Sequence, residues 1–204
     1  MKKILILCAI LCSLFSLKAQ EFNAGILIGA SISQVDGDGM GGFHRIAPQG
    51  GLFVNRQINK TSAIQGELLY VYKGSAIESS QEPIDNVEIL ASYVDIALYY
   101  KYLFSDKIDF KVGLAPSVLI NKKETSNGIE ENSPVGFRKL GLLFSIGTEY
   151  YFNENLFVCA DYNYSIISMR DGDLIVDWSN NFYHFLFDNG QYYNYFKFSF
   201  GYRF

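Results

Sequence analysis

Few residues of this sequence combine the types and the spacing that catalysis needs. His44 and His184 are the only histidines, and both fall in long segments between apolar runs. Acyl transfer of the serine-hydrolase kind needs a histidine held beside a nucleophile and a carboxylate. Ser179 and Asp188 flank His184 only loosely, and no recognisable trio results. We therefore expect ordinary loop histidines and no catalytic residue.

Two acidic glycine-rich runs and one cysteine suggest other chemistry. The run Asp36-Gly37-Asp38-Gly39 begins like a calcium loop, but no further carboxylate and no closing glutamate follow it. Asp171-Gly172-Asp173 has the same defect, so we expect flexible loops at both places, no metal site and no cofactor. Cys159 fits a small packed side chain.

A larger set of charged residues shares one feature, a position in phase with the Gly and Ser residues of alternating segments. The set comprises the acids Glu67, Asp95, Asp109, Glu149 and Asp161 and the bases Lys101, Lys111, Lys139, Lys197 and Arg203. Equal numbers of both signs predict a network of ion pairs, because an isolated charge inside a protein is costly. The competing interpretation is a charge-lined pathway for ions.

The segments that carry these charges alternate with a period of two, which is typical of β-strands. The alternation covers 22–32, 47–58, 62–73, 90–104, 108–120, 140–152, 156–167 and 192–204. Short polar connections alternate with long ones, at 33–46, 74–89, 122–136 and 168–191. An all-β, eight-stranded antiparallel up-and-down barrel is the simplest topology with that pattern.

The distribution of charge and aromatic residues predicts which face of the barrel is outside. The apolar face is almost free of charge and carries aromatic residues near both strand ends with aliphatic ones between, as a bilayer selects. A soluble barrel would point these residues inward instead. Small and charged residues suit the narrow interior of eight strands. The sequence thus predicts a transmembrane barrel surrounded by outer-membrane lipid.

Export and assembly signals agree with that location. Residues 1–19 combine Lys2 and Lys3 with an apolar core and a small residue before the cut, and they predict a signal peptide ahead of a barrel domain at 20–204. Phe204 ends an alternating strand and resembles the signal read by the barrel-assembly machinery. Both ends of the barrel chain would then be periplasmic and the long loops extracellular. A net charge of −4 excludes nucleic acid as a natural partner.

The longest connection, 168–191, is the best candidate for partner contact. It is rich in aromatic residues: Trp178, Phe182, Tyr183, Phe185 and Phe187. Such a loop either folds over the barrel mouth as a lid or presents a contact surface.

Several short motifs resemble the PorT-like family of outer-membrane β-barrel proteins. They are Gly66-Glu67-Leu68-Leu69-Tyr70 with Lys73-Gly74, Tyr93-Val94-Asp95-Ile96-Ala97 with Lys101-Tyr102, Ala160-Asp161-Tyr162-Asn163-Tyr164, and Gly201-Tyr202-Arg203-Phe204. The resemblance implies an outer-membrane barrel, and the namesake branch is associated with protein secretion. Ala97 and Asp161 depart from the family pattern, which weakens the transfer of the namesake's role.

The sequence therefore favours a small non-enzymatic outer-membrane barrel with a closed, ion-paired lumen. Its expected role is structural or in interaction, as an accessory of secretion or surface assembly with a protein partner there. Two alternatives remain: an outer-membrane lipid-modifying enzyme with a site at the rim, and a soluble periplasmic barrel that carries a ligand.

Overall fold

Long antiparallel strands make up nearly all of the chain that can be described. The computed structural model describes residues 22–38, 42–77, 87–130, 136–170 and 190–204. Its strands are β1 (Phe22–Asp36), β2 (Arg45–Asn59), β3 (Ser62–Ile77), β4 (Val87–Leu103), β5 (Ile108–Ser126), β6 (Ile129–Glu130), β7 (Leu140–Tyr151), β8 (Leu156–Ser165) and β9 (Tyr192–Arg203). No helix within these residues is long and apolar enough to cross a membrane. The predicted signal peptide, 1–19, lies outside them.

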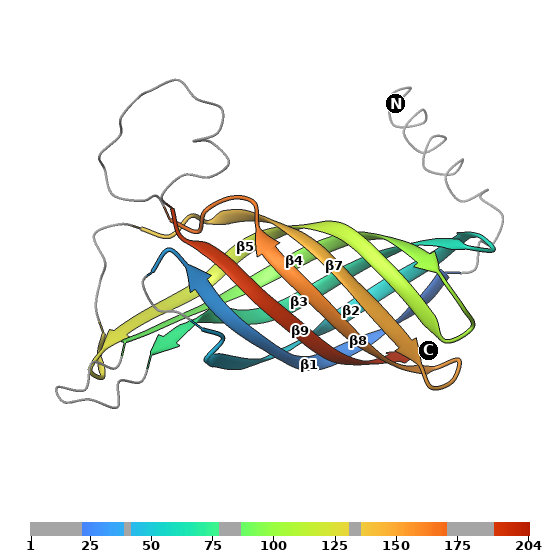
Figure 1. Cartoon of the computed structure of the whole chain (residues 1–204), viewed down its shortest axis with the longest axis horizontal. Helices are drawn as coiled ribbons and strands as arrows, with labels where there is room; N and C mark the ends of the chain where they lie inside the picture. Colours follow the sequence, from blue (N-terminus) through green and yellow to red (C-terminus); the bar gives the residue numbers. More distant parts are fainter. Residues whose placement is uncertain (1–21, 39–41, 78–86, 131–135, 171–189) are drawn as a thin grey trace, which may run out of the picture.

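The eight long strands close into a barrel (Figure 1). Neighbours along the chain pair antiparallel from β1 to β5 and from β7 to β9, β5 pairs with β7, and β9 pairs back onto β1. The two-residue β6 only extends β5. Closure leaves every long strand with a partner on both sides, as a lipid-exposed sheet requires. The predicted eight-stranded up-and-down barrel is confirmed.

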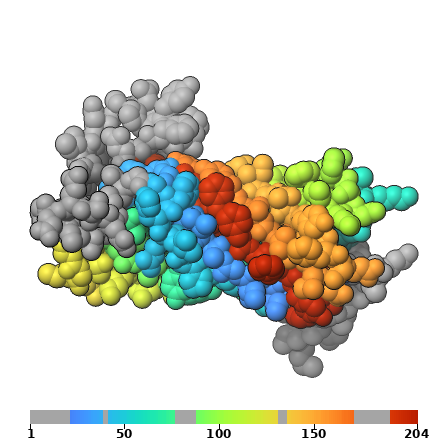
Figure 2. Space-filling model, turned by 60° about the horizontal axis from the view of Figure 1, so that its bottom comes forward, coloured from blue at the N-terminus to red at the C-terminus, as the bar shows by residue number. Residues whose placement is uncertain are grey.

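The outer surface of the barrel is apolar. A belt of aliphatic side chains is exposed on its middle: Ile26, Ile28, Leu68, Ile96, Leu98, Val112, Leu114 and Ile146. Leu98, for example, is 62% exposed. Figure 2 shows neighbouring strands of this surface lying obliquely side by side. An apolar surface of this extent is stable only when lipid covers it.

Aromatic side chains border the belt as expected at the short-turn end. Phe22, Phe104, Phe152 and Phe204 are among the exposed aromatic residues there. At the long-loop end Tyr70 is exposed, but Tyr192 is buried and stacks on Tyr164 with ring centroids 6.3 Å apart. Tyr192 nevertheless keeps the phase of the exposed residues Phe196 and Phe198 along β9.

Several strands are longer than predicted at the long-loop end, whereas β8 ends at Ser165, two residues before the predicted 167. β1 continues to Asp36, β3 continues to Ile77, and β5 runs on to Ser126, where a turn leads into β6. Backbone pairing persists there although the alternation of apolar and polar residues fades. Residues beyond the lipid need no apolar outer face, so the sequence loses its strongest strand signal before the strand ends.

The inside of the barrel is filled by side chains. Phe53 and Phe157 meet edge to face at the short-turn side, with ring centroids 5.3 Å apart. Gly201 makes room for the ring of Phe157, because a Cβ at that glycine would lie 2.2 Å from the ring. Leu27, Leu69 and other buried residues complete the packing. An eight-stranded barrel is narrow enough to be filled in this way.

Candidate functional site

Charged side chains occupy the barrel interior on two levels. The turn-side cluster consists of Glu67, Lys101, Asp109, Lys111, Glu149, Asp161 and Lys197, all of them buried. The loop-side cluster consists of Lys73, Asp95, Ser117 and Tyr195, which are also buried. Eight of the ten charged residues singled out in the sequence lie in these two clusters.

Lys111 is the centre of the turn-side cluster. Its Nζ lies 2.8 Å from Glu67 Oε1, 3.1 Å from Asp161 Oδ1 and 3.4 Å from Glu149 Oε1. Lys197 Nζ lies 3.7 Å from Glu67 Oε2 and from Asp161 Oδ2. The Lys111 side chain is fully buried, and its ammonium lies 4.6 Å from the ring centroid of Tyr99 in addition to these carboxylates.

Lys101 joins the same cluster to the barrel mouth at the short turns. Its Nζ lies 2.5 Å from Glu149 Oε2 and 3.1 Å from Asp109 Oδ2, and it also donates to the Tyr151 hydroxyl at 2.9 Å. Gln65 Nε2 donates to Glu67 and to Glu149, at 2.9 and 2.8 Å. These neutral partners add hydrogen bonds to carboxylate oxygens that also lie close to lysine ammoniums.

Lys73 anchors the loop-side cluster. Its Nζ lies 2.9 Å from both carboxylate oxygens of Asp95 and 3.1 Å from Ser117 Oγ. The Tyr195 hydroxyl donates to Asp95 Oδ2 at 2.9 Å. The rings of Tyr93 and Tyr195 also lie 4.5 and 4.9 Å from the ammonium, within the range of cation–π attraction.

Sequence reasoning missed several members of these clusters, though a signal for them existed. Lys73 and Gln65 share the phase of Glu67, and Tyr195 shares that of Lys197. Lys73 is not predicted as a lumen residue because it is the last residue of the predicted strand, 62–73. Tyr151 is not among the predicted lumen residues, yet its hydroxyl donates to Glu149 Oε2 at 2.7 Å.

Two predicted members do not join the ion pairs. Lys139 is exposed, because β7 begins only at Leu140 and the alternation carries no meaning outside a strand. Arg203 points inward, but its guanidinium lies 5.2 Å from the ring centroid of Tyr151. It forms no ion pair with any residue that the structure describes.

Two other candidate residues from the sequence that the structure describes are His44 and Cys159. The ring of His44 is exposed, and no carboxylate or hydroxyl among the described residues hydrogen-bonds it. Cys159 is buried as a free thiol. The described ranges hold no cluster of His, Cys, Asp and Glu that suits a metal ion.

The predicted contact loop falls in a part of the chain that the structure does not describe. Trp178, Phe182, Tyr183, Phe185 and Phe187 lie within 171–189, as do His184 and the run 171–173. Phe204 is described and is exposed, and its N–H donates to Ala24 O at 3.0 Å. Its role as an assembly signal stays a prediction.

A closed eight-stranded barrel with an apolar belt outside and buried ion pairs inside is a transmembrane barrel of the outer-membrane class. The chain belongs to the family described as outer membrane protein beta-barrel domain, whose model matches residues 18–171. That family places it in the outer membrane. The PorT-like branch of the resemblance stays a prediction, and no curated protein matches the sequence.

Solved structures with a similar fold include that of Ail, the attachment invasion locus protein of Yersinia pestis. The TM-score is 0.53 at 16% identity, and the match covers 90% of this chain and 99% of Ail. Ail in complex with the heparin analogue sucrose octasulfate gives 0.52 at 18% identity, with coverage of 90% and 99%. Its backbone structure in a phospholipid bilayer nanodisc gives 0.50 at 16%, with coverage of 90% and 100%. Identities this low show a shared fold alone.

Proposed function

We propose that this protein is a non-enzymatic, non-conducting barrel with a structural or interaction role in the outer membrane. One observation carries the proposal: ion pairs and hydrogen bonds tie opposite walls of the barrel together on two levels. In the ring of strands β3 lies opposite β8, and Lys111 of β5 bonds Glu67 of β3 and Asp161 of β8. On the other level Tyr195 of β9 bonds Asp95 of the opposite strand β4.

These contacts oppose ion conduction. An ion on the axis would have to separate lysine ammoniums from carboxylates at 2.5 to 3.1 Å, in a space with little water to compensate. The barrel also has only eight long strands, and side chains fill an interior of that size. The side chains in the lumen therefore act as a plug. Interaction with a partner then takes place at the two ends of the barrel.

The interaction role rests on the long-loop end, which we place outside the cell. The aromatic residues of 168–191 are the candidates for a protein partner there. The PorT-like resemblance favours an accessory role in secretion or surface assembly. Export by residues 1–19 and insertion by the barrel-assembly machinery through Phe204 belong to the same proposal.

Two alternative functions are less well supported. A lipid-modifying enzyme would need a trio of residues around a histidine at the rim, and a soluble carrier would leave the apolar belt in water.

Conductance of the protein in planar lipid bilayers tests the plug. We expect no stable open level for the natural protein, nor for the variants Glu67→Ala and Lys101→Ala. Both variants should unfold more readily, whereas Lys139→Ala, which removes an exposed charge at a strand start, should not. A large, stable conductance in the natural protein or in either lumen variant would overturn the plug.

Crosslinking in cells tests the interaction role. A photo-crosslinking residue in place of Phe185 should capture a specific protein of the cell surface, while one in place of Lys107, in a short turn, should not capture it. Equal capture from both positions would contradict a partner at the long loops.

A further inference from the structure

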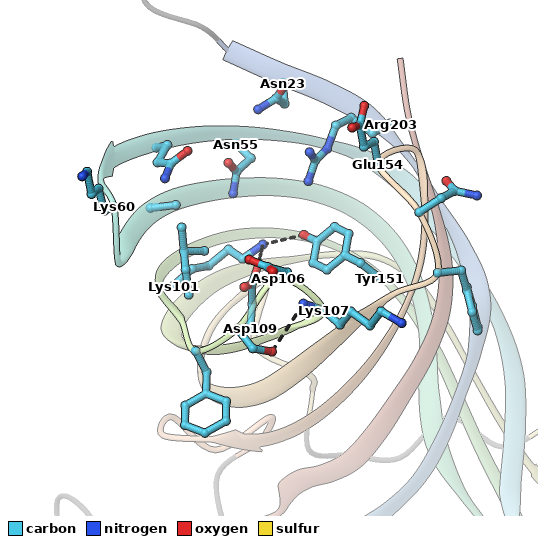
Figure 3. A pocket seen from close by; sticks show the side chains of 17 residues that line it. Asn23, Asn55, Lys60, Lys101, Asp106, Lys107, Asp109, Tyr151, Glu154 and Arg203 are labelled. Carbon is cyan, nitrogen blue, oxygen red and sulfur yellow. Dashed lines mark hydrogen bonds and ion pairs between the residues drawn. The ribbon is translucent and has the colours of Figure 1, made fainter.

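A polar cavity opens at the short-turn end of the barrel (Figure 3). Its volume is about 610 Å³, which is within the range of roughly 300–1,000 Å³ for small-molecule sites. Strands β1, β2, β3, β4, β5, β7 and β9 contribute to its lining, together with three short turns. Most of the lining side chains are polar or charged, so the cavity does not suit a lipid chain or another apolar ligand.

The charged groups at the inner end of the cavity are already paired with one another. Figure 3 shows the Lys101 ammonium meeting the Tyr151 hydroxyl in the middle of the barrel. The same ammonium bonds Asp109, and Glu149 below it. Lys101 has no capacity left for a ligand, so recognition must come from the side walls.

One wall carries three side chains with hydrogen-bond donors from neighbouring strands, and one of them, the Asn55 amide, also donates to Gln65 Oε1 at 3.2 Å. Asn23 of β1 lies directly opposite Asn55 of β2, and Arg203 of β9 pairs with Gly25, two residues along β1. Figure 3 shows all three side chains on one side of the cavity. The Arg203 Nε is buried and has no hydrogen-bond partner among the described residues.

The ring of Tyr151 helps to orient this guanidinium. The ring centroid lies 5.2 Å from Arg203 Cζ, which limits the orientations of the side chain. An oriented guanidinium is the side chain best suited to bind a carboxylate with two parallel hydrogen bonds. The two asparagine amides beside it add neutral donors and acceptors.

The rim of the cavity adds charges of both signs. Asp106 in the β4–β5 turn and Glu154 in the β7–β8 turn have no ion-pair partner within the described part of the chain. Lys60 and Lys107 also stand at the rim. A ligand with charge of one sign would meet repulsion as well as attraction there, whereas one with an anionic and a cationic end would find partners for both.

We propose that this cavity binds an amino acid or a short peptide end, with the ligand's carboxylate on Arg203, Asn23 and Asn55 and its ammonium at Asp106 and Glu154. The site is separate from any partner at the long loops. It would give the barrel a second point of contact, with a soluble ligand on the short-turn side of the membrane. The proposal does not depend on the plug, since conductance and ligand binding are measured independently.

Titration of the purified full-length barrel in detergent micelles with alanyl-alanine tests the site, with calorimetry or amide NMR shifts as the readout. We expect saturable binding that weakens about tenfold or more in Arg203→Gln, the loss that one charge-assisted hydrogen-bond pair implies. Arg56→Gln is the matched control. It removes an arginine at the same end of the barrel, but that side chain is exposed and lies over the ring of Phe22 outside the cavity.

Changes in the ligand separate the two halves of the site. Alanyl-alanine amide, which lacks the carboxylate, should lose binding in the natural protein, and N-acetyl-alanyl-alanine should bind several-fold more weakly. The double variant Asp106→Asn with Glu154→Gln should abolish the difference between the acetylated and free dipeptides. Gel migration before and after boiling shows that each variant is folded.

Three results would overturn the proposal. The first is no saturation by alanyl-alanine in the natural protein at millimolar concentrations. The second is unchanged affinity in folded Arg203→Gln, or an equal loss in Arg56→Gln. The third is binding of inorganic phosphate alone with the affinity of the dipeptide, which would reveal a general anion site.

Discussion

Replacing Lys111 by methionine tests whether the interior charges act as one network. Methionine keeps most of the length and volume of the side chain but removes the ammonium. Three buried carboxylates, those of Glu67, Glu149 and Asp161, lose their shared partner, which now lies 2.8 to 3.4 Å away. We expect Lys111→Met to be strongly destabilising for that reason.

The size of the effect follows from the charge of the turn-side cluster. Three lysines and four carboxylates give 3 − 4 = −1, and loss of Lys111 changes this to −2 without adding water. Breaking a buried ion pair by removal of one partner costs about 3–5 kcal/mol. At roughly 1.4 kcal/mol per tenfold, the ratio of folded to unfolded protein should fall about 100- to 3,000-fold.

A second substitution should restore part of this loss. Lys111→Met with Glu67→Gln leaves two lysines and three carboxylates, so the cluster returns to 2 − 3 = −1. The glutamine can still accept a hydrogen bond from Gln65, as Glu67 does at 2.9 Å. The double variant should therefore be more stable than Lys111→Met alone, which simple addition of two destabilising changes would not give.

Equilibrium unfolding in lipid vesicles with increasing urea measures these differences. The folded fraction is read from the gel migration of unboiled samples and from far-ultraviolet circular dichroism. A loss under about 1 kcal/mol for Lys111→Met would refute the network, because exposed ion pairs have effects of that size. A double variant less stable than Lys111→Met would refute the charge argument.

Three further substitutions probe other parts of the barrel by the same unfolding assay. Lys73→Met should cost about 3–5 kcal/mol and Lys139→Met under about 0.5 kcal/mol, because only Lys73 is buried and paired; similar losses for both would be a contradiction. Leu98→Arg places a charge in the lipid belt and should cost about 2–4 kcal/mol, and a neutral result would argue against lipid there. Gly147→Ala should cost about 1–3 kcal/mol, because its Cβ would lie 1.9 Å from Asp161 Oδ1; an unchanged stability would show that the carboxylate moves freely.

The sequence predicts the barrel well because one physical cause acts along most of each strand. A lipid-facing side chain must be apolar and its neighbours face the lumen, so alternation marks strand, face and environment together. It fails where that cause is absent. Asp36, Ile77 and Ser126 still lie in paired strands, but lipid no longer selects the outer residues.

The interior site is only partly readable for a related reason. The position of a residue in the two-residue alternation is the sole basis for assigning it to the lumen. This places Lys101, Lys111 and Asp161 correctly. The same reasoning wrongly assigns Lys139 to the lumen, although Lys139 precedes β7. It also misses Lys73, because β3 continues beyond the end of the alternating segment. The partners of each charge depend on the register between strands that are distant in sequence, which no local pattern contains.

The same register gives the interior charges a role beyond closing the lumen. In a bilayer an apolar side chain is stable on either face of a strand, so apolar residues alone would not oppose a slip by one position. A slip of β5 would turn Lys111 toward the lipid, where a lysine costs roughly 2–4 kcal/mol at the middle of the membrane and less toward its edges. Slips of β4 and β9 would expose Lys101 and Lys197 in the same way. The charges that fill the lumen therefore also select one register for these strands, and a variant with an entirely apolar interior should insert as a mixture of registers rather than as one barrel.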